Sequence, residues 1–168
     1  DKWFFFYNSL ASGLLYEIDN HIRTIHMSEH HVTTRWAGKM AFDSTVGNHV
    51  VRIDSKPEAG DDSGPGPKSL LLVALTGCTG IDLAALLPKM RVKFDTLEIE
   101  AAAPLTEEHP RVYTEIRLLF RVRGKNLSEE KIRRAIELSQ EKYCGVTAML
   151  KAHCPITWSL ELVEEASK

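Results

Sequence analysis

The segment from Gly64 to Asp82, GPGPKSLLLVALTGCTGID, constrains the fold of this chain more than any other. Its proline-rich start suits the first turn of a helix, where the backbone N–H has no partner anyway. The pattern predicts a helix from about Pro67 to Leu87 that is apolar on nearly every side, ending at Pro88. Such a helix must be covered all round. Either the sheet curls round it or a second subunit covers the remaining face, and a dimer is the more economical answer.

The same helix raises the question of a membrane span, because the run Leu70–Leu87 is long enough for one. Several polar residues interrupt this run, among them Asp82. We therefore expect a buried core helix and no membrane partner. A net charge of -2 over 168 residues gives no electrostatic case for nucleic acid. The length indicates one domain with a sizeable core.

The chain ahead of this helix has the pattern of an antiparallel meander. Polar and apolar residues alternate over 32–36, 40–46 and 49–53, which is typical of half-buried strands. Gly47-Asn48 is a two-residue turn signal between the last two strands. A loop rich in Gly, Pro, Asp and Ser follows over 55–67.

Residues 1–26 have a different pattern. An aromatic cluster is followed by leucines and isoleucines at helical spacing, which indicates an amphipathic arm. The basic start and small-residue cleavage site of a secretory signal are missing. Two interpretations stay open: an arm that packs on its own domain or on a partner subunit, or a non-native extension. We therefore divide the chain into an arm over 1–26 and a single domain over 27–168.

Behind the central helix the pattern predicts two strands, two helices and a last strand. The strands are expected at 93–103 and 111–123, and the second of these alternates most clearly. Ser128 is expected to cap the first helix, and a shorter helix follows at 146–152. The last strand is expected at 156–163. This order predicts an α+β fold in which helices cover one face of an antiparallel sheet.

Three cysteines are the candidate reactive groups. Their odd number argues for a reducing, cytoplasmic compartment rather than a disulfide framework, and their spacing predicts no metal site. Cys78 lies within the central helix, where activation needs a cation from elsewhere. Cys144 is expected to open the short helix, where the amides and the dipole favour a thiolate. Cys154 is interpreted as a spare surface or strand-edge thiol. For each cysteine the alternative to a reactive thiol is a purely structural role, since a lone buried cysteine more often packs as a small apolar side chain than acts as a nucleophile.

Asp82 lies four residues after Cys78, on the same face of the helix. It either orients a partner or simply ends the apolar face, and the second interpretation is favoured.

The motif Gly-Pro-Gly-Pro-x-x-Leu-Leu-Leu-x-Ala-Leu-x-Gly-Cys-Thr-Gly-Ile-Asp at 64–82, with Glu-Lys-Tyr-Cys at 141–144, resembles the OsmC/Ohr family. These are the osmotically inducible and organic hydroperoxide resistance proteins, and the likeness is strongest to the YhfA-like branch. It spans about Val32 to Val163. It implies the OsmC-like α+β fold, with antiparallel sheets wrapped around a buried central helix. It also implies an intertwined homodimer with two active sites at the interface.

The resemblance further implies a thiol-dependent peroxidase that acts on organic or small hydroperoxides in oxidative stress defence. Such enzymes need no metal, haem or other cofactor. By that likeness Cys78 is the peroxidatic thiolate and becomes a sulfenic acid. Cys144 then resolves it as a disulfide, which a dithiol reductant reduces.

Two positions depart from the family pattern. Peroxidatic relatives activate the thiolate with an arginine from the first hairpin, held by a glutamate just after the helix-opening proline. Here those places read Gly38-Lys39 and Lys68-Ser69. Lys39, Arg35 and Lys68 are the remaining candidates for lowering a thiol pKa by charge. The alternative function is a non-catalytic OsmC-like protein that binds a small apolar or thiol-reactive ligand at the dimer cleft.

Overall fold

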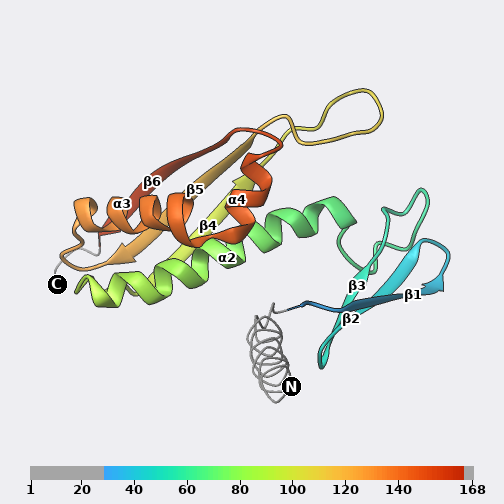
Figure 1. Ribbon diagram of the computed structural model, residues 1–168, viewed down its shortest axis with the longest axis horizontal. Helices are drawn as coiled ribbons and strands as arrows, with labels where there is room; N and C mark the ends of the chain where they lie inside the picture. Colours follow the sequence, from blue (N-terminus) through green and yellow to red (C-terminus); the bar gives the residue numbers. More distant parts are fainter. Residues whose placement is uncertain (1–28, 165–168) are drawn as a thin grey trace, which may run out of the picture.

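A computed structural model of the chain describes residues 29–164, so the predicted arm over 1–26 lies outside the described residues. The predicted order of strands and helices is confirmed, with one π-helical turn added. Figure 1 shows two separate sheets joined by the long helix α2. The elements are β1 (Val32–Gly38), β2 (Ala41–Val46), β3 (His49–Ile53), α2 (Pro67–Lys89), β4 (Thr96–Ala102), β5 (Ile116–Gly124), α3 (Glu129–Leu138), η1 (Ser139–Tyr143), α4 (Gly145–Lys151) and β6 (Ile156–Glu164).

The first sheet is the predicted antiparallel meander, in the order β1-β2-β3. Its two turns lie at Lys39-Met40 and Gly47-Asn48. Gly38, the last residue before the first turn, and Gly47 both have positive φ, which tight hairpins favour. Figure 1 shows this sheet standing away from the second one. Within its strands only Ala41 and Ser44 are buried. The sheet therefore has almost no apolar core of its own.

The second sheet has the order β4-β5-β6 and departs from the predicted antiparallel pattern. β4 pairs with β5 antiparallel, but β6 pairs with β5 parallel, with Ile116 opposite Ile156. Parallel neighbours need a long crossover connection. Here α3, η1 and α4 form that crossover and return the chain to the end of the sheet where β5 began.

The core of the described residues lies between this sheet and two helices. The alternation predicted for β5 is confirmed, because its even-numbered residues from Ile116 to Val122 are buried. Helices α2 and α3 lie side by side on that face, as expected for helices covering one face of a sheet. The predicted strand start at 111 is wrong, because residues before Ile116 form only an isolated bridge between Leu105 and Tyr113. The core side chains include Leu75, Leu83, Leu87, Phe120, Ile132, Ala135 and Ile136.

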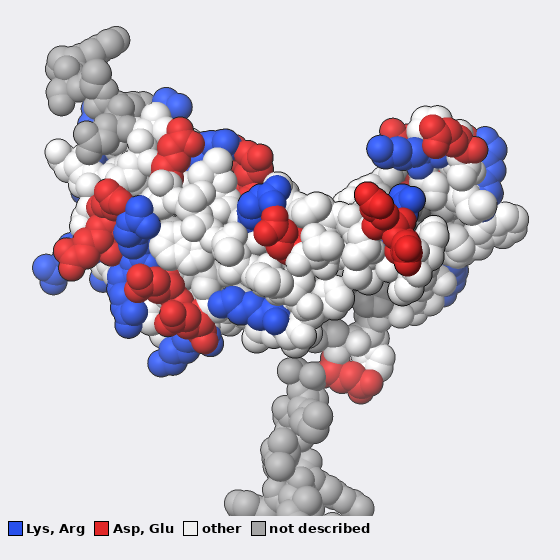
Figure 2. All heavy atoms as spheres, turned by 90° about the horizontal axis from the view of Figure 1, so that it is seen from above, with Lys and Arg blue, Asp and Glu red and all other residues white. Residues whose placement is uncertain are grey.

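The opposite face of the second sheet is polar. Arg121 lies at its centre and forms ion pairs with Glu98, Glu100 and Glu161 from the two neighbouring strands. Figure 2 shows Lys and Arg side chains interspersed with Asp and Glu on the face that it draws. That face therefore carries no single-sign patch of the kind that binds nucleic acid.

Helix α2 differs from the prediction in two ways. It is not covered on every side, because Val73 and Ile81 are 59% and 73% exposed. It also continues through Pro88 to Lys89. A proline this close to the end removes only one helical hydrogen bond, so the helix ends instead where Arg91 adopts a positive φ of 61°. The helix is long and apolar enough to cross a bilayer, but its contacts with β4, α3 and α4 make it the central helix of this fold.

A π-helical turn, η1, connects α3 to α4. The Cys144 N–H donates to the Ser139 carbonyl at 2.9 Å, five residues back instead of four. This extra residue rotates the end of the turn about the helix axis, so Tyr143 is 49% exposed although it follows the buried Ser139 by four residues, at helical spacing. The predicted cap at Ser128 is confirmed, since its hydroxyl accepts from the Lys131 N–H. Cys144 is the N-cap of α4, also as predicted.

Candidate active site

The structure brings Cys78 and Cys144 together. Cys78 lies midway along α2, and Cys144 lies at the start of α4, which packs against that helix. The two sulfurs and a carboxylate oxygen of Asp82 all lie within 4.8 Å of one another. Both cysteines are free thiols. Cys144 is 4% exposed, whereas Cys78 is partly exposed, so a small molecule in solvent reaches Cys78 first.

The Cys144 sulfur accepts hydrogen bonds from backbone and side chain. The Thr147 N–H donates to it at 3.3 Å, in the first turn of α4. The Thr79 hydroxyl donates to it at 3.6 Å from the neighbouring turn of α2. Such donors favour the thiolate over the thiol.

A buried amide, Gln140 in the π turn, directs these hydroxyls. Its Nε2 donates to the Thr79 oxygen at 3.1 Å, which leaves the Thr79 proton free to point at the Cys144 sulfur. The Thr147 hydroxyl donates to Gln140 Oε1 at 3.3 Å. The Lys151 ammonium donates to the Gln140 carbonyl at 3.2 Å and secures the turn. The side-chain amide nitrogen, the side-chain oxygen and the backbone carbonyl of Gln140 are therefore all held by hydrogen bonds.

The two thiols differ in acidity. Burial alone would raise the pKa of Cys144, but hydrogen bonds from Thr147, Cys78 and Thr79 outweigh burial and lower it. Burial raises the pKa of Cys78, and its contact with Cys144 and the nearby charge of Asp82 add to the effect. In the single chain, Cys144 is thus the more acidic thiol of the pair, as its place at a helix start predicted.

Asp82 belongs to the site, although the favoured interpretation was that it only ends the apolar face of α2. The Ser139 hydroxyl donates to its Oδ2 at 2.8 Å, from the first residue of the π turn. This bond fixes the carboxylate beside the two sulfurs. Ser139 itself is fully buried.

The three candidate cations occupy other places in the single chain. Lys39, at the β1–β2 turn, pairs with Asp61 at 2.5 Å, and the hydrogen bond with that carboxylate raises the pKa of Lys39. Arg35 is exposed on β1, and Lys68 lies in the first turn of α2, where its carbonyl accepts from the Tyr113 hydroxyl. Their role in activating a thiol stays a prediction.

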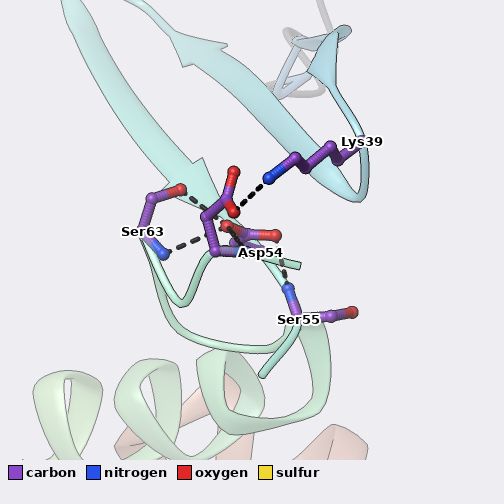
Figure 3. Close-up of polar contacts among 5 residues, drawn as sticks. Lys39, Asp54, Ser55 and Ser63 are labelled. Carbon is purple, nitrogen blue, oxygen red and sulfur yellow. Dashed lines mark hydrogen bonds and ion pairs between the residues drawn. The ribbon is translucent and has the colours of Figure 1, made fainter. Parts of the chain in front are cut away.

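The loop that holds Lys39 is built around a buried carboxylate (Figure 3). Asp54 is 2% exposed and accepts from the N–H groups of Ser55, Asp61 and Ser63 and from the Ser63 hydroxyl. These bonds, first of all those from Ser63, lower its pKa to about 2. Gly60 is required beside it, because a Cβ there would lie 2.3 Å from Asp54 Oδ1.

Cys154 lies just before β6 and is 7% exposed, so it is a buried thiol at a strand start and not a surface one. It lines a pocket of about 360 Å³ with Tyr113, Leu150 and His153, away from the paired cysteines.

Four further polar residues of the site were missed by sequence reasoning. They lie close to the cysteines in the sequence, one after Cys78 and the others within five residues of Cys144. The one available signal was a polar residue, Thr79, in a helix predicted to be covered all round. They are Thr79, Ser139, Gln140 and Thr147.

Three comparisons relate this chain and its fold to known proteins. Residues 60–159 match the family model of OsmC-like proteins. Protein YhfA of Escherichia coli strain K12 is 34% identical over 130 residues, which cover 77% of this chain and 95% of YhfA.

Solved structures with the same fold support this relationship. A hypothetical protein from Aquifex aeolicus has a TM-score of 0.75 at 28% identity, covering 83% of this chain and 100% of that one. The organic hydroperoxide resistance protein OhrB of Bacillus subtilis has the same fold, with a TM-score of 0.60 at 20% identity over 80% of this chain and 99% of its own. The matched model covers both cysteines, and the identity to YhfA spans most of the chain. The chain therefore belongs to the family of OsmC-like proteins.

Proposed function

We propose that this protein is a two-cysteine, thiol-dependent peroxidase that reduces organic or small hydroperoxides in oxidative stress defence. The observation that carries the proposal is the closeness of the Cys78 and Cys144 sulfurs, with hydrogen-bond donors aimed at one of them. The family includes organic hydroperoxide resistance proteins with the same fold, such as OhrB of Bacillus subtilis. The free cysteines suit a reducing compartment, and we place the protein in the cytoplasm.

The reaction divides between the thiols according to their exposure. The Cys78 thiolate, the more accessible of the two, attacks the terminal oxygen of the hydroperoxide; the O–O bond breaks and the alcohol leaves after taking up a proton. Cys78 is then a sulfenic acid. The Cys144 thiolate displaces its oxygen as water, with a proton from solvent, and forms the disulfide. An external dithiol restores both thiols.

A homodimer is part of this proposal. The first sheet and α2 expose large apolar side chains, which in a soluble protein mark interaction surfaces. A second copy would cover them and would bring its own first hairpin toward the open side of α2. Lys39 or Arg35 of that hairpin, or Lys68 at the start of α2, would then supply a positive charge near Cys78. The exposed side chains include Val32, Trp36, Met40, Val50, Val73 and Ile81.

The test is a single turnover. Reduced, chelator-treated protein receives one equivalent of cumene hydroperoxide, and its mass and cysteine-containing peptides are analysed. We expect rapid loss of two hydrogen atoms and a crosslink between Cys78 and Cys144. Cys144→Ser should trap a sulfenic acid at Cys78, and Cys154→Ser is the matched control that should behave as wild type. If both thiols stay reduced over minutes in excess peroxide, the peroxidase proposal fails.

A second candidate is a non-catalytic protein that binds a small apolar or thiol-reactive ligand at the dimer cleft. It is favoured by a mainly apolar pocket of about 470 Å³ beside the open face of α2. Its lining includes Gly77 and Gly80, which lie close to Cys78 in the sequence, together with Phe94, Leu97 and Ile99. Unreactive thiols combined with saturable binding of an apolar fluorescent probe, abolished by Gly80→Leu, would favour this function.

A further inference from the structure

The group formed by Cys78, Asp82 and Cys144 has a second chemical capacity besides redox. One ligand atom from each residue lies within 4.8 Å of the other two. We propose that in the reduced protein these three side chains bind a thiophilic divalent cation of the zinc class. This site goes beyond the peroxidase proposal and does not depend on it.

The spacing of the ligands supports the site. Cys78 and Asp82 are four residues apart on α2, so their side chains lie one above the other on one helix face. The same spacing places two metal ligands on one helix in zinc metalloproteases. Cys144 completes the group from a different element, the start of α4. Two ligands from one helix and a third from a distant segment are a common arrangement for zinc with an open coordination position.

The distances also fit. Zinc holds thiolate sulfur at about 2.3 Å, so two sulfurs on one tetrahedral ion lie roughly 3.8 Å apart. Ligand atoms within 4.8 Å of one another approach this separation with small side-chain rotations. Two soft sulfurs and one carboxylate favour zinc over magnesium or calcium, which prefer oxygen ligands alone. A water molecule would complete the tetrahedron.

Each ligand is oriented by an outer contact, as metal ligands usually are. The Ser139 hydroxyl holds one carboxylate oxygen of Asp82 at 2.8 Å and leaves the other free to bind a cation. The Thr147 N–H and the Thr79 hydroxyl fix the Cys144 sulfur. The ligand group is therefore already positioned in the single chain.

The negative charge that Cys78, Asp82 and Cys144 can carry also favours a bound cation. Two thiolates and a carboxylate would gather three negative charges, and among residues 29–164 no Lys, Arg or His forms an ion pair with Asp82. A divalent cation would neutralise two of these charges, and each bound thiol would release its proton to solvent. Because the disulfide uses both sulfurs, metal binding and oxidation exclude each other.

The test uses the reduced, chelator-treated full chain without oxygen. Zinc is titrated against a chromophoric chelator, and cobalt(II) serves as the spectroscopic probe. We expect one equivalent of metal per chain, near-ultraviolet thiolate-to-cobalt charge transfer and the visible bands of a tetrahedral ion. Cys78→Ser and Cys144→Ser should each remove much of the charge-transfer intensity. Asp82→Asn should weaken zinc binding by at least about tenfold, and Ser139→Ala by roughly tenfold, as outer contacts do.

Cys154→Ser is the control and should bind as wild type, and circular dichroism checks that every variant is folded. The inference is overturned if cobalt shows no charge transfer, if Cys154→Ser weakens binding as much as Cys78→Ser, or if Asp82→Asn leaves the zinc affinity unchanged. Peroxide turnover by the metal-free protein is scored separately. Zinc binding without peroxide turnover would sink only the peroxidase proposal, and the reverse result would sink only the metal site.

Discussion

The two sheets of this protein differ in what holds them together. The second sheet buries one face under α2 and α3, around Phe120 and other fully buried side chains. The first sheet has three well-paired strands, yet Trp36 is 69% and Val50 66% exposed. A small sheet in water needs a covered apolar face to be stable. The difference indicates that the second sheet and its helices carry their own stability, whereas the first sheet depends on a surface that residues 29–164 do not provide.

The sharpest test of this difference is a pair of phenylalanine substitutions. Phe120→Ala empties a fully buried site in the second half and should cost about 3–5 kcal/mol of unfolding free energy. Phe42→Ala removes a side chain that is 39% exposed in the first sheet and should cost much less in a monomeric sample. Denaturant unfolding measures both, and equal losses would contradict the comparison.

The proposed dimer interface, which would cover the first sheet and α2, can be disrupted by a charge on the exposed face of α2. Ile81→Glu places a carboxylate at a side chain that is 73% exposed in the single chain. It should leave the monomer folded but raise the dimer dissociation constant by at least about a hundredfold, near 3 kcal/mol. Sedimentation over a concentration series measures this, with Thr157→Glu on the polar face as control. Unchanged association would remove α2 from the interface.

In the second sheet and its helices, the hydrogen bonds among Thr79, Gln140 and Thr147 beside Cys144 should make a separate contribution to stability. Gln140→Ala removes one hydrogen-bond partner from each of the buried hydroxyls of Thr79 and Thr147 and should cost about 1–3 kcal/mol of unfolding free energy. It should also slow alkylation of Cys144 near neutral pH, because the Thr79 hydroxyl loses its fixed orientation. Glu141→Ala, exposed on the same turn, is the matched control. Equal unfolding curves for the two variants would show that the cluster adds nothing.

The smallest effect is expected in the loop before α2. The pKa of Asp54 is lowered from 3.8 to about 2, so its stabilising contribution is fully present above pH 3.8 and is lost as pH falls through 2. Amide exchange over residues 55–63, corrected for intrinsic rates, should accelerate in that window. Asp54→Asn should exchange fast at every pH, whereas Asp62→Asn should follow the wild type. A pH-independent loop would contradict this role for Asp54.

Local chemistry explains the features that were predicted well from the sequence. Alternation along β5, the cap at Ser128 and the helix start at Cys144 each depend on neighbouring residues, and each is present. The shared motifs of the family added the pairing of Cys78 with Cys144, which spacing could not supply.

Other features depend on distant segments. The parallel direction of β6 follows from the length and path of the crossover, and the site role of Asp82 requires Ser139 from another helix. The uncovered face of α2 could not be assigned either, because hydrophobicity shows that a surface is to be buried but not by which chain.

Because of the π turn, the pairing of the two cysteines depends on the exact number of residues in η1. Because η1 contains one residue more than an α-helical turn would, deleting a single codon within 139–143 would return the segment to regular α-helix. The chain beyond the deletion would then rotate by about 100° about the helix axis. Cys144 would keep its neighbours in the sequence but lose its position opposite Cys78. One inserted residue therefore separates a chain whose two thiols lie together from one whose thiols lie apart. The number of residues between Ser128 and Cys144 is a way to sort relatives into these two groups.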